Sequence, residues 1–258
     1  MSRITFVVLA LALVVPTALL GGCASKYGTQ RTSVHYYPAC YRPIHDLRAN
    51  EHNVAKGTAG GAVLGAMGGA LLGFLTTGKA EGALVGGVAG AATGAVVGNL
   101  YAKKKQITDE NRRMASYLED IDGDIRNLDI ASASARASLD CYDREFKQLL
   151  NDIRTRRLTR REAEDRYGEI TSGREEAIAL LGNAVNNGRD LDRQYEQAFV
   201  QEERSMKRSG SSRLTQVKRR KQNLTSRVNE VSRQKQQAET QTVTNQRDFT
   251  ARLKEIDA

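Results

Sequence analysis

Few residues in this chain are of types that carry catalysis, and they do not form a catalytic pattern. The carboxylates Glu119, Asp120, Asp122 and Asp124 fall close together, but at positions where a helix surface ordinarily carries acidic residues. No serine lies in a strand-to-helix nucleophile turn. We therefore predict that the protein is not an enzyme, with no catalytic residue.

Metal binding is the second chemistry that the side chains suggest. The 3 histidines, His35, His45 and His52, lie near Cys40 in the sequence, and imidazole and thiolate ligands suit copper or zinc. Their spacing matches no tight metal-binding motif. We therefore predict no metal site and no cofactor other than covalent lipid.

Covalent lipid is predicted from the start of the chain. Arg3 and the apolar run Ile4 to Leu20 have the form of a secretory signal, which ends in Leu20-Gly21-Gly22-Cys23. This tetrad resembles the bacterial lipobox, in which the signal is cut before a cysteine that carries diacylglycerol. The resemblance implies a signal peptide over residues 1–22 and a mature chain that begins at Cys23, with diacylglycerol and fatty acid such as palmitate attached. An uncleaved anchor is the alternative.

Cys40 and Cys141 are the two thiols left once Cys23 is acylated. An even pair of cysteines in an exported chain most simply forms a disulfide. Bridging between chains and two free thiols are the alternatives. Residues 23–56 are otherwise a polar, tyrosine-bearing segment without a sustained period, which we interpret as a lipidated tether.

The next segment, residues 57–102, is an internal repeat of glycines at every fourth position. Between Lys56 and Lys79, and again between Glu81 and Lys103, the chain carries no charge over about 20 residues, which is enough for a helix to cross a bilayer. The spacing predicts a transmembrane helical hairpin whose glycine ridges are helix-packing faces. The ridge residues are Gly57, Gly61, Gly65, Gly69 and Gly73, followed by Gly82, Gly86, Gly90, Gly94 and Gly98.

These two ladders and the signal resemble the two-span glycine-zipper family of bacterial envelope lipoproteins, which includes SlyB-like and rickettsial surface-antigen-like members. The resemblance covers the signal and residues 57–102. It implies a membrane-inserted lipoprotein and says nothing of residues 105–258.

Residues 103–258 have a different pattern, in which apolar residues alternate steps of three and four. This period predicts a helical coiled-coil domain. Thr159 and Glu162 form a capping box, and Ser209 to Ser212 interrupt the pattern again. We therefore predict an all-α protein, in which the hairpin precedes an antiparallel three-helix coiled-coil rod of roughly 70 Å. A break in the second helix near residues 186–188, giving four shorter helices, is the alternative.

The third predicted helix carries a strongly basic run. Between Arg204 and Lys235 a single acidic residue, Glu230, stands among many lysines and arginines. Such a run favours an acidic partner, either an acidic protein, anionic lipid, or the other two helices of the same rod. The basic face consists of Arg213, Lys218, Arg219, Arg220, Lys221 and Arg227.

The net charge of +9 suggests nucleic acid only for a protein that stays in the cytoplasm, and export removes that partner. The hypothesis is a structural cell-envelope lipoprotein that self-associates or holds a membrane partner. A pore or secretion component built from oligomerised hairpins and a scaffold whose rod binds a periplasmic protein are the alternatives. By the sorting rule of enterobacterial lipoproteins, Ala24 after Cys23 favours the outer membrane over the inner, with the rod in the periplasm.

Overall fold

The computed structural model describes residues 30–57, 103, 106–205 and 212–255. These residues form helices α2 (Pro38–Gly57), α5 (Glu110–Arg154), α6 (Arg160–Ser205) and α7 (Ser212–Leu253), and contain no strand. The predicted all-helical class is confirmed for this part of the chain. None of the helices so described has the length and hydropathy needed to cross a membrane. The predicted hairpin lies outside the described residues, apart from Gly57 at the end of α2.

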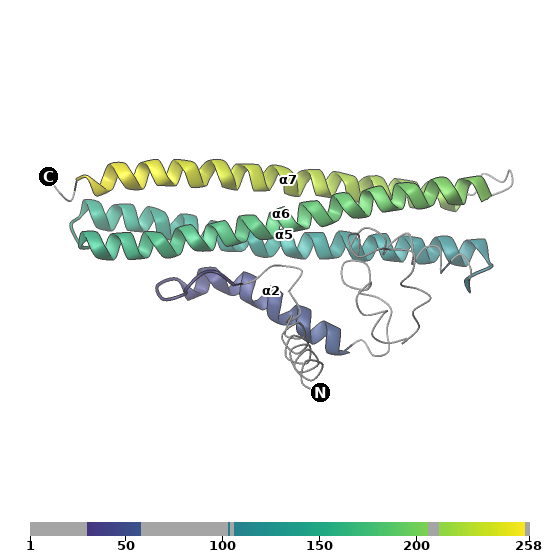
Figure 1. Ribbon diagram of the computed structural model, residues 1–258, viewed down its shortest axis with the longest axis horizontal. Coiled ribbons are helices and arrows are strands. Elements are labelled where there is room, and N and C mark those ends of the chain that lie inside the picture. The colour runs from purple at the N-terminus through teal and green to yellow at the C-terminus, as the bar shows by residue number, and fades with distance from the viewer. Residues whose placement is uncertain (1–29, 58–102, 104–105, 206–211, 256–258) are drawn as a thin grey trace, which may run out of the picture.

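Three long helices, α5, α6 and α7, lie side by side along their whole length (Figure 1). Consecutive helices run in opposite directions, as the sequence pattern predicts. The turn from α5 to α6 lies between a C-terminal motif of α5 and an N-terminal motif of α6. Arg156 takes φ of 53° and the amide of Arg157 donates to the carbonyl of Asp152 (2.9 Å), which closes a Schellman turn.

The start of α6 is the predicted capping box. The Thr159 amide donates to the Glu162 carboxylate (2.9 Å), and the Glu162 amide donates to the Thr159 hydroxyl (3.3 Å). These two bonds satisfy amides that have no partner within the helix. A helix of 46 residues follows without interruption, about 69 Å long at 1.5 Å per residue. The alternative of a break near residues 186–188 is therefore wrong.

The core of the bundle follows the apolar period of the sequence. Along the three-and-four period of α5, Leu118 and Ile125 are partly buried, and the other core positions are buried. These are Met114, Ile121, Leu128, Ser132, Ala135, Leu139, Tyr142, Phe146, Leu149 and Ile153. Gly188 of α6 is a site of close approach, because an added Cβ would lie 2.5 Å from Cγ2 of Val228 on α7. The glycine that interrupts the apolar pattern thus lets α6 and α7 approach each other closely.

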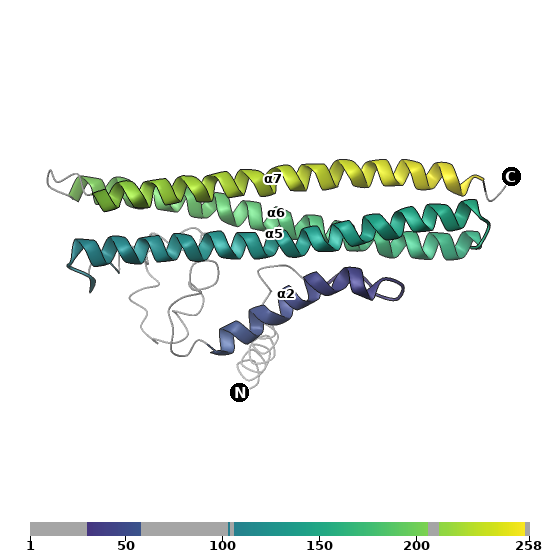
Figure 2. The same ribbon diagram turned by 180° about the vertical axis from the view of Figure 1, so that it is seen from behind.

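Helix α2 was not expected, and it lies against the outside of the bundle, antiparallel to α5 (Figures 1 and 2). Its N-terminal half packs on α5 and α6, and its axis diverges from the bundle toward Gly57. A helical period is present in the buried residues Tyr37, Cys40, Tyr41, Ile44 and Leu47. Pro38 and Pro43 obscured this period. Pro38 is the first helical residue, where no amide hydrogen is needed.

Candidate functional site

The candidate site is the junction that fastens the N-terminal segment to the bundle. We call it the clasp, and it consists of residues 31–48 together with Ser138, Cys141, Glu169 and Glu176. Its covalent part is a disulfide between Cys40 of α2 and Cys141 of α5, whose Cα atoms are 5.1 Å apart. Beside it, the buried hydroxyl of Ser138 donates to the carbonyl of Cys40 (2.7 Å). The disulfide links residues that are 101 positions apart.

Glu169 of α6 holds the beginning of α2. Its side-chain oxygens accept hydrogen bonds from the backbone amides of His35 (2.9 Å), Tyr36 (2.7 Å) and Tyr37 (2.9 Å). These amides precede the first turn of α2, where the helix dipole favours a negative charge. Glu169 is 6% exposed. The first turn of α2 contains no acidic residue, and this carboxylate from α6 takes that place as the acceptor at the helix N-terminus.

Glu176 lies seven residues, or two helical turns, further along the same face of α6. Its carboxylate accepts from the amide (3.0 Å) and hydroxyl (2.6 Å) of Thr32, from the hydroxyl of Tyr41 (2.9 Å), and from the amide of Arg31 (3.2 Å). The guanidinium of Arg48 forms a salt bridge with the same carboxylate. Glu176 is only 4% exposed. This buried negative charge therefore joins both the extended segment and α2 to the bundle.

The hydrogen bonds of this cluster also fix its protonation states. Burial alone would raise the pKa of Glu176, but the bonds from Thr32, Arg48, Arg31 and Tyr41 outweigh burial and hold that pKa below its ordinary value. Burial and the hydrogen bond to Glu176 raise the pKa of Tyr41 to about 12. Glu176 is therefore a stable acceptor and Tyr41 a stable donor at neutral pH.

A second junction lies where the chain returns to the bundle. Lys103 Nζ contacts both carboxylate oxygens of Asp120 on α5, at 2.8 and 2.7 Å. Asp120 is 21 residues, or three heptads, before Cys141, so the two anchor points lie on one stripe of α5. Between them, this stripe holds the buried residues Asp124, Asn127, Ala131 and Ser138. In the sequence, small and polar residues at heptad spacing are the pattern that indicates this second packing face of α5.

The four clustered carboxylates of α5 do not act together. Asp120 binds Lys103, Asp122 pairs with Arg220, and Asp124 accepts from the hydroxyl of Tyr195 (2.7 Å). Glu119 is exposed. Because each carboxylate has a different environment, the cluster is a set of structural contacts and not a general acid–base pair.

The basic face of α7 meets acidic groups of the same chain. Arg213 donates to the carbonyl of Asn111 (3.3 Å), and Arg219 is exposed. Burial alone would lower the pKa of Lys221, but its contacts with Glu196 and Asp192 raise it. Acidic side chains of α5 and α6 therefore contact part of this basic face, and an external acidic partner stays a prediction. The ion pairs are Lys218 with Glu203, Arg220 with Asp122, Lys221 with Asp192 and Glu196, and Arg227 with Asp129 and Glu230.

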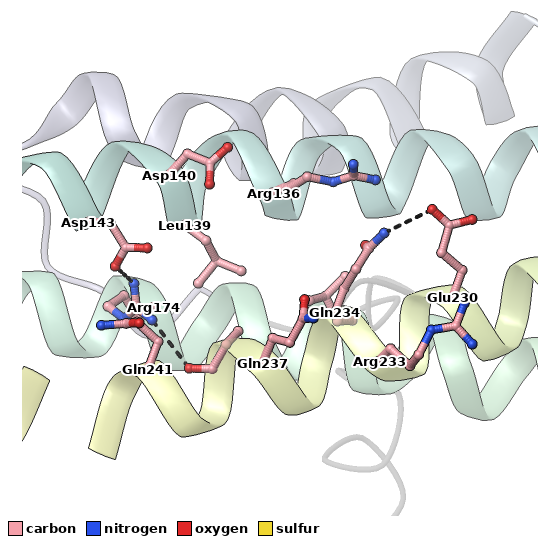
Figure 3. Close-up of a pocket in the computed structure, with 12 residues that line it drawn as sticks. Arg136, Leu139, Asp140, Asp143, Arg174, Glu230, Arg233, Gln234, Gln237 and Gln241 are labelled. Atoms are coloured by element: carbon pink, nitrogen blue, oxygen red, sulfur yellow. Dashed lines mark hydrogen bonds and ion pairs between the residues drawn. The ribbon is translucent and has the colours of Figure 1, made fainter. Parts of the chain in front are cut away.

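A polar groove of about 540 Å³ runs along the bundle between α5 and α7 (Figure 3). At one end of the groove, Arg174 of α6 is 1% exposed and pairs with Asp143 of α5. The same guanidinium donates to the hydroxyl of Thr242 (3.2 Å) and to the carbonyl of Ala238 (3.3 Å) on α7. Arg174 occupies a core position of α6, so this polar layer connects all three helices.

Among the described side chains, His35 and His45 lie apart from the two cysteines that the structure places. His35 lies beside Ser33 and His45 beside Asp46, and both histidines are exposed. Ligand atoms of Cys40, Cys141 and Glu145 lie within 4.8 Å of one another. The disulfide occupies both of those sulfur atoms, whereas metal binding needs thiolates.

The predicted lipidation and zipper residues lie outside the described part of the chain. This holds for Cys23 and for the ridge from Gly61 to Gly98. No curated protein and no solved structure matches the chain. A family model does match, and its description is YMGG-like Gly-zipper. The match covers residues 1–102, so this part of the chain is similar to the glycine-zipper family, which indicates a membrane-associated, lipoprotein-like protein.

Proposed function

We propose that the protein is a structural lipoprotein of the bacterial outer membrane, in which a lipid on Cys23 and a zipper hairpin hold a periplasmic three-helix rod. The observation that supports this most is that the chain is fastened to the bundle both before and after the zipper segment. Before the segment, α2 carries the clasp with its disulfide. After it, Lys103 pairs with Asp120.

The mechanism that we propose is mechanical. A hairpin joined by flexible linkers would move independently of the rod, whereas this one is attached to it on both sides of the zipper. A force on the rod is then transmitted to the membrane segment, and the glycine ridges pack the two spans or neighbouring hairpins. The role needs no catalytic group.

Lipid attachment is tested on Cys23. The Cys23→Ser variant should accumulate as an unprocessed precursor that takes up no labelled palmitate, while Cys40→Ser, as a matched control, should be processed and labelled normally. Normal processing of Cys23→Ser would contradict the lipoprotein assignment.

Topology is tested with an impermeant thiol reagent on intact cells. The turn between the two spans should face the cell surface, so Thr77→Cys should react. Ser211→Cys, between α6 and α7, should react only after the outer membrane is opened. The opposite pattern, or fractionation with the inner membrane, would contradict the outer-membrane assignment.

Self-association is tested at the middle of the two ridges. Replacing Gly65 and Gly90 with leucine puts bulk where helix backbones must approach closely, which should weaken crosslinking between chains. An unchanged crosslinking pattern would show that the ridges are not interfaces between copies.

A further inference from the structure

We propose that the rod lies along the membrane surface, with the flank that carries α2 facing the lipid headgroups, and does not stand upright on one of its ends. This inference rests on the proposed insertion of the zipper hairpin. It follows from where the zipper segment leaves and rejoins the bundle.

The two ends of the zipper segment reach the same level of the rod. Cys40 is bonded to Cys141, and from there α2 runs antiparallel to α5 for 17 residues to Gly57, or about 25 Å (Figure 1). Asp120, which holds Lys103, lies 21 residues from Cys141, or about 31 Å along α5. Because α2 diverges from the bundle, its advance along the rod axis is somewhat less than 25 Å, so the departure and return points differ by at least about 6 Å along that axis, a separation that suits the adjacent ends of a helical hairpin.

Both points lie on the flank of the bundle and at some distance from its end. Asp120 is ten residues into α5, so about 15 Å of the bundle extends beyond it. Few residues lie between the glycine ladder and the described residues on either side of it. Gly57 is both the last residue of α2 and the first glycine of the ladder, and four residues separate Gly98 from Lys103.

The part of the bundle beyond Asp120 is charged on its surface. Arg112 and Arg213 are exposed, and the side chains of Glu203 and Lys218 are 56% and 44% exposed. In an upright rod this end would enter the hydrocarbon, where exposed charges are strongly disfavoured. A rod that lies along the surface keeps these charged groups in water and among the headgroups. Helix α2 diverges from one side of the bundle, so it directs the chain toward a membrane on that side (Figure 2).

The test measures the height of each end of the rod above the bilayer. The full chain is reconstituted into vesicles of phosphatidylethanolamine and phosphatidylglycerol with a headgroup-labelled acceptor. A donor dye is attached at one of three exposed sites, in the variants Arg161→Cys at the far end, Thr215→Cys at the near end and Glu119→Cys at the attachment level. The clasp disulfide stays oxidised throughout, so each variant has one reactive rod thiol.

With α2 between the bundle and the headgroups, a rod along the surface keeps every site within about three helix diameters, roughly 30–36 Å, of the headgroups. We therefore expect similar energy transfer at all three sites. An upright rod separates Arg161 from Thr215 by about 66 Å in height. Strong transfer at Thr215→Cys with loss of transfer at Arg161→Cys would overturn the inference while leaving the proposed function intact. Failure of the protein to float with the vesicles would overturn both.

Discussion

Glu176 is the residue whose removal should open the clasp. Replacing it with alanine removes the acceptor of four hydrogen bonds and leaves Arg48 without its buried ion-pair partner. Removing one member of a buried ion pair costs about 3–5 kcal/mol. Individual hydrogen bonds to a charged group, at about 1.5–3 kcal/mol each, are not additive here, so we expect a total of about 3–5 kcal/mol.

The disulfide keeps α2 close to the bundle, so this loss should appear as local opening and not as global unfolding. Since about 1.4 kcal/mol is a tenfold change, amides of residues 40–48 should exchange with deuterium roughly 10²- to 10³-fold faster in Glu176→Ala. Amides of α7 should be unchanged. The measurement is hydrogen exchange with mass spectrometry on the full chain in detergent.

Glu175 offers a matched control, because it is the exposed neighbour on the same helix. Glu175→Ala should leave exchange in α2 at the wild-type rate. If Glu176→Ala also exchanges at that rate, the carboxylate does not hold the clasp, and the packing of Tyr41, Ile44 and the disulfide must be sufficient.

Three further predictions concern stability. Cys141→Ser should lower the free energy of unfolding by about 4–5 kcal/mol in the loop-entropy description, because the bridge closes a loop of about 100 residues. If the variant and the wild type unfold at the same urea concentration under oxidising conditions, the two cysteines do not form a stabilising bridge. Gly173→Ala should destabilise the fold by about 1–3 kcal/mol, because the new Cβ would lie 2.2 Å from the Tyr142 ring. Gly168→Ala has open space around the new Cβ and should stabilise the fold by about 0.5–1 kcal/mol. Shifts of the melting temperature with the same sign in both variants would refute the close approach. The pKa of Glu176 is lowered in the folded state, so its stabilisation is present above the ordinary glutamate pKa of 4.5 and is lost as the pH falls below it. Protection of the α2 amides, measured relative to their intrinsic exchange rate at each pH, should therefore fall in acid for the wild type. The same fall in Glu176→Ala would assign it to another group.

The main helices could be predicted from the sequence because their packing is periodic. Apolar residues such as Ile121, Leu128 and Leu149 recur at coiled-coil spacing, and this period alone decides which side of a helix turns inward. The capping box at Thr159 was equally local, since its bonds join residues three positions apart. The glycine ladder, a repeat within residues 57–98, predicted the family that matches residues 1–102.

The clasp could not be predicted in the same way, because its contacts join residues that are far apart in the chain. Glu169 and Glu176 read as ordinary solvent-facing glutamates until the fold places them beneath residues 31–48, more than 120 positions away. The pairing of Cys40 with Cys141 was one of several possibilities until α2 lay antiparallel to α5. Local period thus determined the helices, whereas the tertiary structure decided where α2 binds, because burial of a carboxylate is favourable only when distant donors converge on it.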